Sequence, residues 1–251
     1  LSLTAQDGAA IGAYAIAGAA SAAISSRSTT LGGTLVGAGT GNTIDRPIQA
    51  IIGNTDPLQK GSGRVDVRNL TLLAERTADS RIIADAAGVA IAAALSTSGQ
   101  SSALSAALAG GFSFNTLRGG VTAGVYNISD LNVTGETSIS AYAIEADQQS
   151  GASGNVDTFA GGFAVNFSRS SGGASLGGSL GLVVTENTIE DTLQAQISGV
   201  SGGNDQDVTL GSLTINAENE RAIRAQATGD AITIAAGTVQ SPAGGLSIGA
   251  V

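Results

Sequence analysis

The sequence predicts an all-β protein, a right-handed parallel β-solenoid (β-helix) of about three to four repeats of ~72 residues each. Three observations support this prediction. Two sequence motifs recur along the chain, their apolar residues alternate with period two, and the composition favours small side chains.

Composition shows what kind of core the chain can build. Of the 251 residues, 37 are Gly, 42% are hydrophobic, 3% are aromatic and 12% are charged. Disordered chains combine low hydrophobicity with high net charge, so a packed structure is expected here. Because bulky anchors are scarce, Ala, Val, Ile, Leu and Gly must form the core, which favours flat backbone layers that approach closely.

The first motif is an Asn-Thr pair followed by an aliphatic residue. It recurs after 73 and then 72 residues, as Asn42-Thr43-Ile44, Asn115-Thr116-Leu117 and Asn187-Thr188-Ile189. Further apolar residues follow each copy at every second position, which is typical of a strand. We therefore expect Asn42, Thr43, Asn115, Thr116, Asn187 and Thr188 to occupy equivalent places in stacked repeats.

The second motif pairs a Leu-rich segment with a segment of the form Ile-x-Ala-x-Ala. The Leu-rich segments begin at Leu1, Leu70, Leu131 and Leu213, and the Ile segments begin at Ile11, Ile82, Ile139 and Ile223. The distances between them, 10, 12, 8 and 10 residues, are all even. Even spacing keeps the inward face of a strand unchanged, whereas a helix has no such requirement.

The repeats define the organisation of the chain. We expect residues 1–251 to form one repetitive solenoid segment, with repeats near 1–69, 70–130, 131–212 and a partial repeat 213–251. Ala-rich runs such as 86–94 favour helix by propensity, but Gly, Ser and Thr interrupt most Ala runs. Each repeat could form one wide coil or about three ordinary coils. The charge-free stretches 88–117 and 170–185 are expected to be buried on both faces or packed under a neighbouring layer.

Several functional classes are excluded or disfavoured. The chain has no Cys and no His, which excludes disulfides, thiolate or His metal sites and ordinary Ser-His-Asp or Cys-His catalysis. A net charge of −9 disfavours nucleic acid and anionic membranes as partners. The uncharged run 8–26 is too rich in Ala, Gly and Ser to span a membrane. Because the sequence contains no Met, we expect a fragment or a processed product.

Three groups of charged or polar residues are candidate sites. Glu186, Glu190 and Asp191, with Asp45 at the place of Glu190 in the first repeat, could supply paired carboxylates, but a solvated turn is the simpler interpretation. Arg76, Arg81, Glu75 and Asp79 could resemble a lyase site, and alternating surface charge is again simpler.

The third group is a candidate cation site. The segment 202–208 differs by one residue from a calcium-binding nonapeptide repeat, and Ca²⁺ prefers oxygen ligands. Its candidate ligands are Asn204, Asp205 and Asp207. Only one copy of the nonapeptide is present, whereas such sites share ions between adjacent copies, so an ordinary acidic turn is the alternative. No other cofactor is expected.

The chain resembles the repeats of giant bacterial surface and secreted proteins, namely filamentous-haemagglutinin-like adhesins and related large β-strand-repeat exoproteins. The residues that carry the resemblance are Phe163-Ala164-Val165-Asn166, Asn187-Thr188-Ile189, Val208-Thr209-Leu210 and Leu213-Thr214-Ile215-Asn216-Ala217. The resemblance implies a secreted or cell-surface location, a β-solenoid shaft, and a role in adhesion or extracellular assembly, with no catalytic residues. The middle repeat departs from the pattern at Arg118-Gly119-Gly120, so stacking is expected to be less regular there.

The leading functional hypothesis is therefore a non-catalytic structural shaft segment of an extracellular filament or adhesin. Its partners would be neighbouring repeats of the same long chain or like chains. The alternative is a carbohydrate-binding or carbohydrate-active β-helix domain, which needs carboxylates and an Arg gathered in one groove. A third hypothesis places a surface glycan or protein receptor on the loops 53–63 and 199–211. The sequence does not discriminate among ligands or assembly states.

Overall fold

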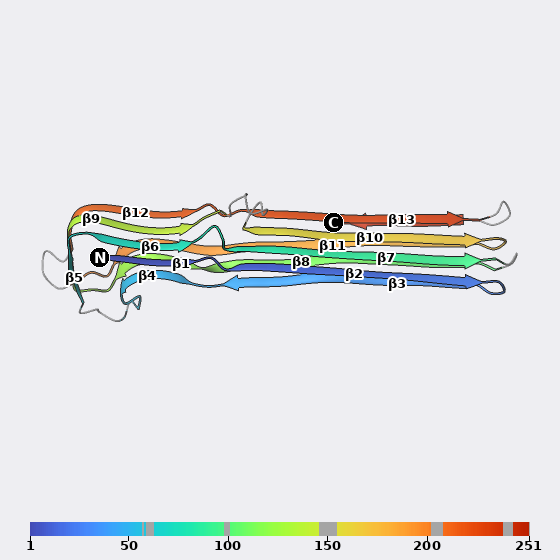
Figure 1. Cartoon of the computed structure of the whole chain (residues 1–251), viewed down its shortest axis with the longest axis horizontal. Coiled ribbons are helices and arrows are strands. Elements are labelled where there is room, and N and C mark those ends of the chain that lie inside the picture. The colour runs from blue at the N-terminus through green and yellow to red at the C-terminus, as the bar shows by residue number, and fades with distance from the viewer. Residues whose placement is uncertain are drawn as a thin grey trace.

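The structure is a computed structural model that describes residues 1–56, 58, 63–97, 101–145, 155–201, 208–237 and 243–250. These residues form fourteen β-strands and no helix (Figure 1). The strands build three sheets in which every pair of neighbours is parallel. The predicted all-β parallel solenoid architecture is confirmed.

Each sheet takes strands from successive repeats. Sheet A has the order β1 (Ser2–Asp7), β6 (Leu70–Arg76), β9 (Asp130–Ala143), β12 (Val208–Asn219), with β5 (Arg64–Val67) also beside β9. Sheet B has the order β2 (Ala10–Ser25), β7 (Arg81–Ser96), β10 (Val156–Ser170), β13 (Ile223–Ala236). Sheet C has the order β3 (Thr30–Asp45), β8 (Ala103–Tyr126), β11 (Ser175–Ser198), β14 (Ala243–Ala250), with β4 (Ile48–Gly53) also beside β8.

One repeat makes one wide, flat coil. Coil 1 contains β1 to β4, coil 2 β5 to β8, coil 3 β9 to β11 and coil 4 β12 to β14. Within a coil the chain runs through sheet A and then sheet B, turns, and returns along sheet C, which packs against both. Of the two alternatives, one wide coil per repeat is therefore correct. The long axis of the molecule follows the strands rather than the direction of stacking (Figure 1).

The Asn-Thr motif marks true structural equivalence. Asn42 pairs with Asn115, and Asn115 pairs with Asn187, so the three copies lie side by side on neighbouring strands of sheet C. The register is continuous across Arg118-Gly119-Gly120 between coils 2 and 3. Between coils 1 and 2 the strand is interrupted at the same level, because β3 ends at Asp45 and β4 begins at Ile48.

The second motif was misaligned in its third copy. The register places Thr137, not Leu131, beside Leu70 and Leu213, whereas Leu131 pairs with Val65. The partner of Ile82 in coil 3 is Val156, since Ile139 belongs to sheet A. Thr137 and Val156 are 19 residues apart, so the even spacing does not hold in coil 3. Strand alternation fixes the inward face only within a strand, and the connection between sheets A and B resets it.

The half of the coil formed by sheets A and C has a conventional apolar core. Leu70, Leu72 and Leu131 are fully buried there. Together with Val121, Val125, Val133 and Ile139 they form the largest hydrophobic cluster among the described residues. Burying one such side chain contributes about 1.5–3 kcal/mol.

The half formed by sheets B and C has the opposite distribution of side-chain size. Its interior is lined by small residues, because the two backbones approach closely. A Cβ on Gly88 would lie 2.4 Å from the carbonyl oxygen of Gly110, and one on Gly111 would lie 2.6 Å from that of Gly161. Only glycine fits such contacts. Ser and Thr pairs such as Ser21 and Thr34 bond across the gap.

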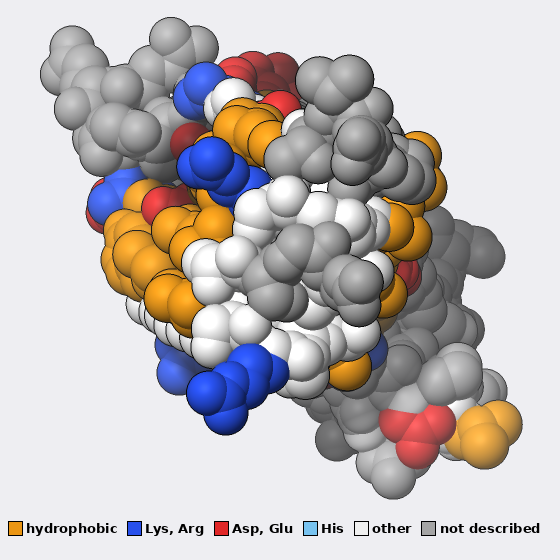
Figure 2. Space-filling model, turned by 90° about the vertical axis from the view of Figure 1, so that its right-hand side faces the viewer, with side chains coloured by type: hydrophobic (Ala, Val, Ile, Leu, Met, Phe, Trp, Pro, Cys, Tyr) orange, Lys and Arg blue, Asp and Glu red, His pale blue; other side chains and the backbone are white. Residues whose placement is uncertain are grey.

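Most of the larger apolar residues of this half point outward, whereas Ile44, Ile82, Leu117 and Val156 form a buried cluster at the end next to sheet A. Leu31, Leu35, Val89, Ile91 and Phe114 are all exposed. Viewed from the end where the B-to-C turns lie, hydrophobic side chains gather on the two flanks of the molecule, with backbone and other side chains between them (Figure 2). Of the two alternatives for the stretch 88–117, burial on both faces is wrong for its described residues 88–97 and 101–117, and packing against a neighbouring layer is confirmed. One face is buried against the opposite sheet, and the other is the outer surface of the solenoid.

Candidate functional site

The inward residues of the Asn-Thr motif form a hydrogen-bonded ladder that crosses the coils. Asn42 Nδ2 donates to Asn115 Oδ1 at 2.8 Å, and Asn115 Nδ2 donates to Asn187 Oδ1 at 2.9 Å. Asn187 Nδ2 then donates at 2.8 Å to Thr158 Oγ1 on sheet B. Each Asn donates one amide hydrogen bond to the next member of the ladder. The ladder therefore joins three coils and connects sheet C with sheet B.

The threonines of the motif lie on the other face. Thr43, Thr116 and Thr188 pair in register on the outer surface of sheet C. The alternation of side chains along a strand explains this division between a buried Asn and an outward Thr. Both members of the motif thus repeat for structural reasons.

A second ladder consists of buried charges, with one member from each coil. Its members are Asp7 from coil 1, Arg76 from coil 2, Asp191 from coil 3 and Arg221 from coil 4. The sign of the charge alternates from one coil to the next. Asp7 and Arg76 end their strands in sheet A, Arg221 lies between β12 and β13, and Asp191 faces them from β11. We call these four residues the charge ladder.

The contacts of the charge ladder are enclosed, and they are ion pairs without hydrogen bonds, because neither carboxylate oxygen of Asp191 accepts one from a described residue. The side chains of Arg76 and Asp191 have no solvent exposure, and Arg76 Nη2 lies 3.4 Å from Asp191 Oδ1. Arg221 Nε lies 3.2 Å from Asp191 Oδ2. Arg76 also reaches Asp7, at 4.0 Å. A buried carboxylate between two guanidinium groups offsets part of its desolvation by their attraction.

The backbone of sheet C is shaped to receive Arg76. Its Nη2 donates to the carbonyl oxygen of Arg46 at 2.8 Å. Gly119 lies beneath this guanidinium group with φ of 141°, a conformation that side chains disfavour. A Cβ there would meet Arg76 Nη2 at 2.5 Å and the Arg46 carbonyl oxygen at 2.3 Å. The segment Arg118-Gly119-Gly120, which departs from the repeat pattern, therefore lies against the buried guanidinium group of Arg76.

Burial sets the protonation properties of the charge ladder. It raises the pKa of Asp191 above its ordinary value, while the guanidinium groups of Arg76 and Arg221 oppose that rise. Burial also lowers the pKa of Arg221 to about 10, with Asp191 opposing. Desolvation disfavours the charged form of both groups, and their mutual attraction restores part of the loss.

The structure corrects the simpler interpretation of two charged residues. Arg76 and Asp191 were expected on a solvated surface, but both side chains are buried. Arg76 ends a strand whose side chains alternate, and position 76 faces inward like Leu70 and Leu72. Glu190 points to the opposite face from Asp191 and is exposed, so these two carboxylates do not face one cleft.

The other members of the two groups lie apart from the charge ladder. Glu75 is on the outer face, where it accepts a hydrogen bond from Gln6 Nε2. Asp45 is exposed and pairs with Arg118, 2.9 Å away. Asp7 and Arg221 were not singled out from the sequence. Asp7 follows Leu1 at the same distance as Arg76 follows Leu70. Opposite charges at one repeat position were the signal in the sequence that could have indicated a contact between them.

The proposed calcium ligands Asn204, Asp205 and Asp207 lie outside the described residues. In the part of the chain that the structure describes, no cluster of three or more acidic, His or Cys side chains is placed to hold a metal ion. The same part contains no helix that is long and apolar enough to span a membrane.

The outer coils leave their inner surfaces open. In coil 4, Leu213 is 48% exposed, whereas its equivalent Leu70 in coil 2 is 0% exposed. Ile215 and Ile223 are also exposed, although their equivalents Leu72 and Ile82 are buried. Among the described residues, the strands of coils 1 and 4 each pair on one side only. Such edges are templates for the pairing of further strands.

Comparison of the chain with models of protein families, with curated proteins and with solved structures finds no match.

Proposed function

We propose that this chain is a non-catalytic shaft segment of a large extracellular filament or adhesin, in which like coils continue the solenoid at both edges. The observation that carries the proposal is the combination of repeating coils with unpaired edges. Inward leucines that are buried in the middle coils are exposed in coil 4. A further coil in the same register would bury them and satisfy the edge peptide groups.

The charge ladder supports stacking of like coils. It ends with Arg221 in coil 4 and begins with Asp7 in coil 1. A coil of the coil 1 type placed on coil 4 in the same register would bring a carboxylate beside Asn219, two residues before Arg221, and so close to the free end of the charge ladder. Opposite charges at the contact fix the register of association more than its strength. The filament partners are therefore repeats of the same long chain or like chains.

The width of the coil defines what kind of shaft this would be. One coil uses ~72 residues for a rise of only ~4.8 Å, the spacing of neighbouring strands. Four coils therefore extend the solenoid by about 19 Å along its axis. Such a coil builds a broad ribbon with large faces. This geometry suits an extracellular layer or a thick fibre that presents surface for attachment.

Blocking one edge tests the proposal. The carbonyl groups of Ala9 and Ser25 accept bonds from coil 2, so alternation turns the N–H of Ala20 towards the free edge of β2. Ala20→Pro removes an edge donor and obstructs a new strand, whereas Ala20→Ser keeps the donor. At rising concentration we expect the wild type and Ala20→Ser to assemble end to end and Ala20→Pro to stop, as measured by electron microscopy of negatively stained particles.

The location is tested on the source cells with an antibody raised against the folded chain. Labelling of intact, unpermeabilised cells, concentrated on surface fibres or on shed material, is the expected result. Label that appears only after permeabilisation would overturn the extracellular assignment. Assembly that is equally strong in Ala20→Pro would overturn stacking through the coil edge.

A further inference from the structure

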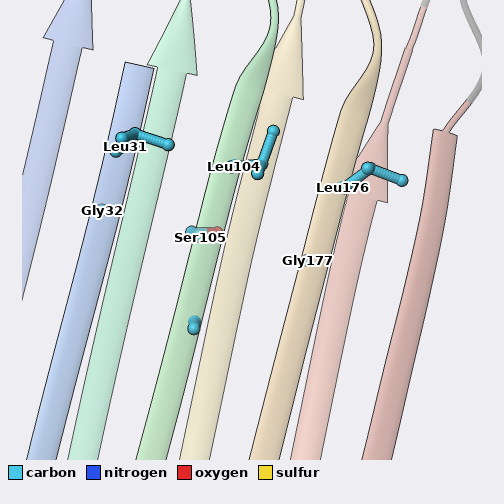
Figure 3. Close-up of a pocket in the computed structure, with 7 residues that line it drawn as sticks. Leu31, Gly32, Leu104, Ser105, Leu176 and Gly177 are labelled. Atoms are coloured by element: carbon cyan, nitrogen blue, oxygen red, sulfur yellow. The ribbon is translucent and has the colours of Figure 1, made fainter. Parts of the chain in front are cut away.

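The outer surface of sheet C carries a regular array of apolar ridges. Leu31, Leu104 and Leu176 pair in register and form one ridge across three coils (Figure 3). A second ridge, four residues further along the strands, consists of Leu35, Leu108 and Leu180. Leu35 is 79% exposed, so these side chains stand out from the sheet. We call this surface, from residues 31–39, 104–114 and 176–184, the ridged face.

Furrows of small residues separate the ridges. Gly33, Ala106 and Gly178 lie between the two leucine rows. Beyond the second row, Gly37 and Gly110 line a groove of about 260 Å³ that is walled by Leu35, Leu108, Phe112 and Leu182. Ridges and furrows alternate every two residues, or roughly 7 Å. The same spacing in two copies lets the leucines of one face enter the furrows of another.

Charge distinguishes the ridged face from the other flank. The stretches 28–44, 103–117 and 170–185 contain no charged residue. The outer surface of sheet B carries Asp85, Asp157, Arg169, Arg224 and Asp230. Two chains that each carry a net charge of −9 repel each other least where both contacting surfaces are uncharged. The charges therefore select sheet C as the surface on which two copies meet.

The size of the ridged face fits a reversible contact. About 30–36 Å of strand and three strand spacings of ~4.8 Å give roughly 430–520 Å² on each copy. Two copies would then bury roughly 900–1,000 Å², at the low end for specific complexes, which corresponds to weak association. Apolar patches of several hundred Å² often mark interaction sites.

We propose that the ridged face binds the ridged face of a second copy of this chain, with ridges fitted into furrows and the two solenoids lying flank to flank. This contact is lateral and uses side chains, whereas stacking of coils uses strand edges. It joins parallel ribbons into thicker fibres. The two contacts depend on different residues, so each can fail while the other persists.

The central residue of the second ridge provides the test. Leu108→Asp places a carboxylate in the middle of the contact, and Ile91→Asp is its matched control on the outer surface of sheet B in the same coil. The two side chains are 38% and 45% exposed, so neither supports the core. Both substitutions are made in the Ala20→Pro chain, in which end-to-end growth is blocked, and we expect this parent chain to sediment as a dimer of two 24.3 kDa chains. Leu108→Asp should weaken dimerisation at least 100-fold, and Ile91→Asp less than about threefold, in analytical ultracentrifugation.

A cross-link gives an independent readout, because the chain contains no Cys. Leu108→Cys should be joined into dimers by a short bis-maleimide, and Ile91→Cys should not. Circular dichroism and the unfolding temperature establish that each variant is folded. If Leu108→Asp does not fold, Leu35→Asp at the edge coil replaces it.

Three results would overturn the proposal. The first is an Ala20→Pro parent chain that stays monomeric at every concentration reached. The second is equal weakening by the variants on both flanks. The third is a monomer that binds vesicles of neutral phospholipid and loses this binding in Leu108→Asp, which would assign the ridged face to lipid. Loss of end-to-end growth in Ala20→Pro leaves the lateral dimer unchanged, so failure of stacking is distinguishable.

Discussion

The two halves of each coil solve the problem of packing two sheets in opposite ways. Where sheet A faces sheet C, bulky residues such as Leu72 and Val121 fill the gap, and polar residues face solvent. Where sheet B faces sheet C, Ala, Gly, Ser and Thr line most of the gap, and most leucines and isoleucines face outward; the exception is the buried cluster around Ile82 and Leu117 next to sheet A. One chain thus alternates large-inside and small-inside packing within a single coil.

The two halves therefore use their large apolar side chains differently, one to stabilise the interior and the other to form the outer surface. In the A–C half, burial of large apolar side chains supplies the stability. In the B–C half, stability rests on backbone ladders and on close contact between layers, because small side chains bury little area each. The larger side chains of this half are then free to form an exterior surface. The charge ladder lies at the boundary between the two halves, beside the end of sheet A.

A larger side chain between sheets B and C should produce the largest loss of stability. Gly111→Val places a side chain where a Cβ already meets the Gly161 and Ala86 carbonyl oxygens at 2.6 and 2.8 Å. Because both neighbours are backbone, the layers must separate, and we expect a loss of at least about 3 kcal/mol or no folding. Urea unfolding followed by circular dichroism measures the loss.

The matched control is Gly33→Ala on the outer surface of the same sheet, where an added Cβ has no atom within 4 Å. It should change stability little, or raise it slightly by restricting the unfolded chain. Near-native stability of Gly111→Val would show that the layers are not held at the close separation described above.

Removing the central cation of the charge ladder should have the next largest effect. Arg76→Met leaves the buried carboxyl group of Asp191 with Arg221 alone and removes the donor to the carbonyl oxygen of Arg46. Removing one partner of such a set typically costs about 3–5 kcal/mol. Arg118→Met, at a half-exposed surface ion pair, is the control and should cost no more than about 1 kcal/mol. A small loss for Arg76→Met would mean that water reaches Asp191.

Much of the fold could be predicted from the sequence because identical residues recur at nearly equal spacing. Asn42, Asn115 and Asn187 are aligned by their own chemistry, since side-chain amides bond to one another along a parallel ladder. The alignment failed at Thr137, because coil 3 has Thr where the other coils have Leu. When a residue departs from the repeat pattern, as Thr137 does, the sequence around it does not show which position of the repeat it occupies.

Two features could not be predicted from the sequence, for different reasons. They are the inward face of the B–C half and the charge ladder. Hydrophobicity alone would turn Leu31 and Leu35 inward, and only the close approach of the two layers reverses that choice. Arg76 and Asp191 are 115 residues apart and come from different sheets, so nothing local links them. Both features depend on how the layers meet, which is a property of the assembled coil.

The pH dependence of stability gives the smallest expected effect and tests whether burial or attraction dominates at the charge ladder. Burial raises the pKa of Asp191 above 3.8, so the folded chain holds this proton at a pH where the unfolded chain has lost it. The contribution is therefore fully present below pH 3.8 and is lost as the pH rises through the pKa of the folded state.

The wild type should consequently gain stability relative to Asp191→Asn on acidification from pH 7 to pH 4, by about 1.4 kcal/mol for each unit by which the pKa is raised. Urea unfolding of both proteins at four pH values measures this difference, and the other carboxyl groups cancel in the comparison. A difference that shrinks on acidification would mean that the attraction of Arg76 and Arg221 exceeds the cost of burial. The boundary between the two halves would then hold a net stabilising ion pair, and the charge ladder would strengthen the coil as well as fix its register.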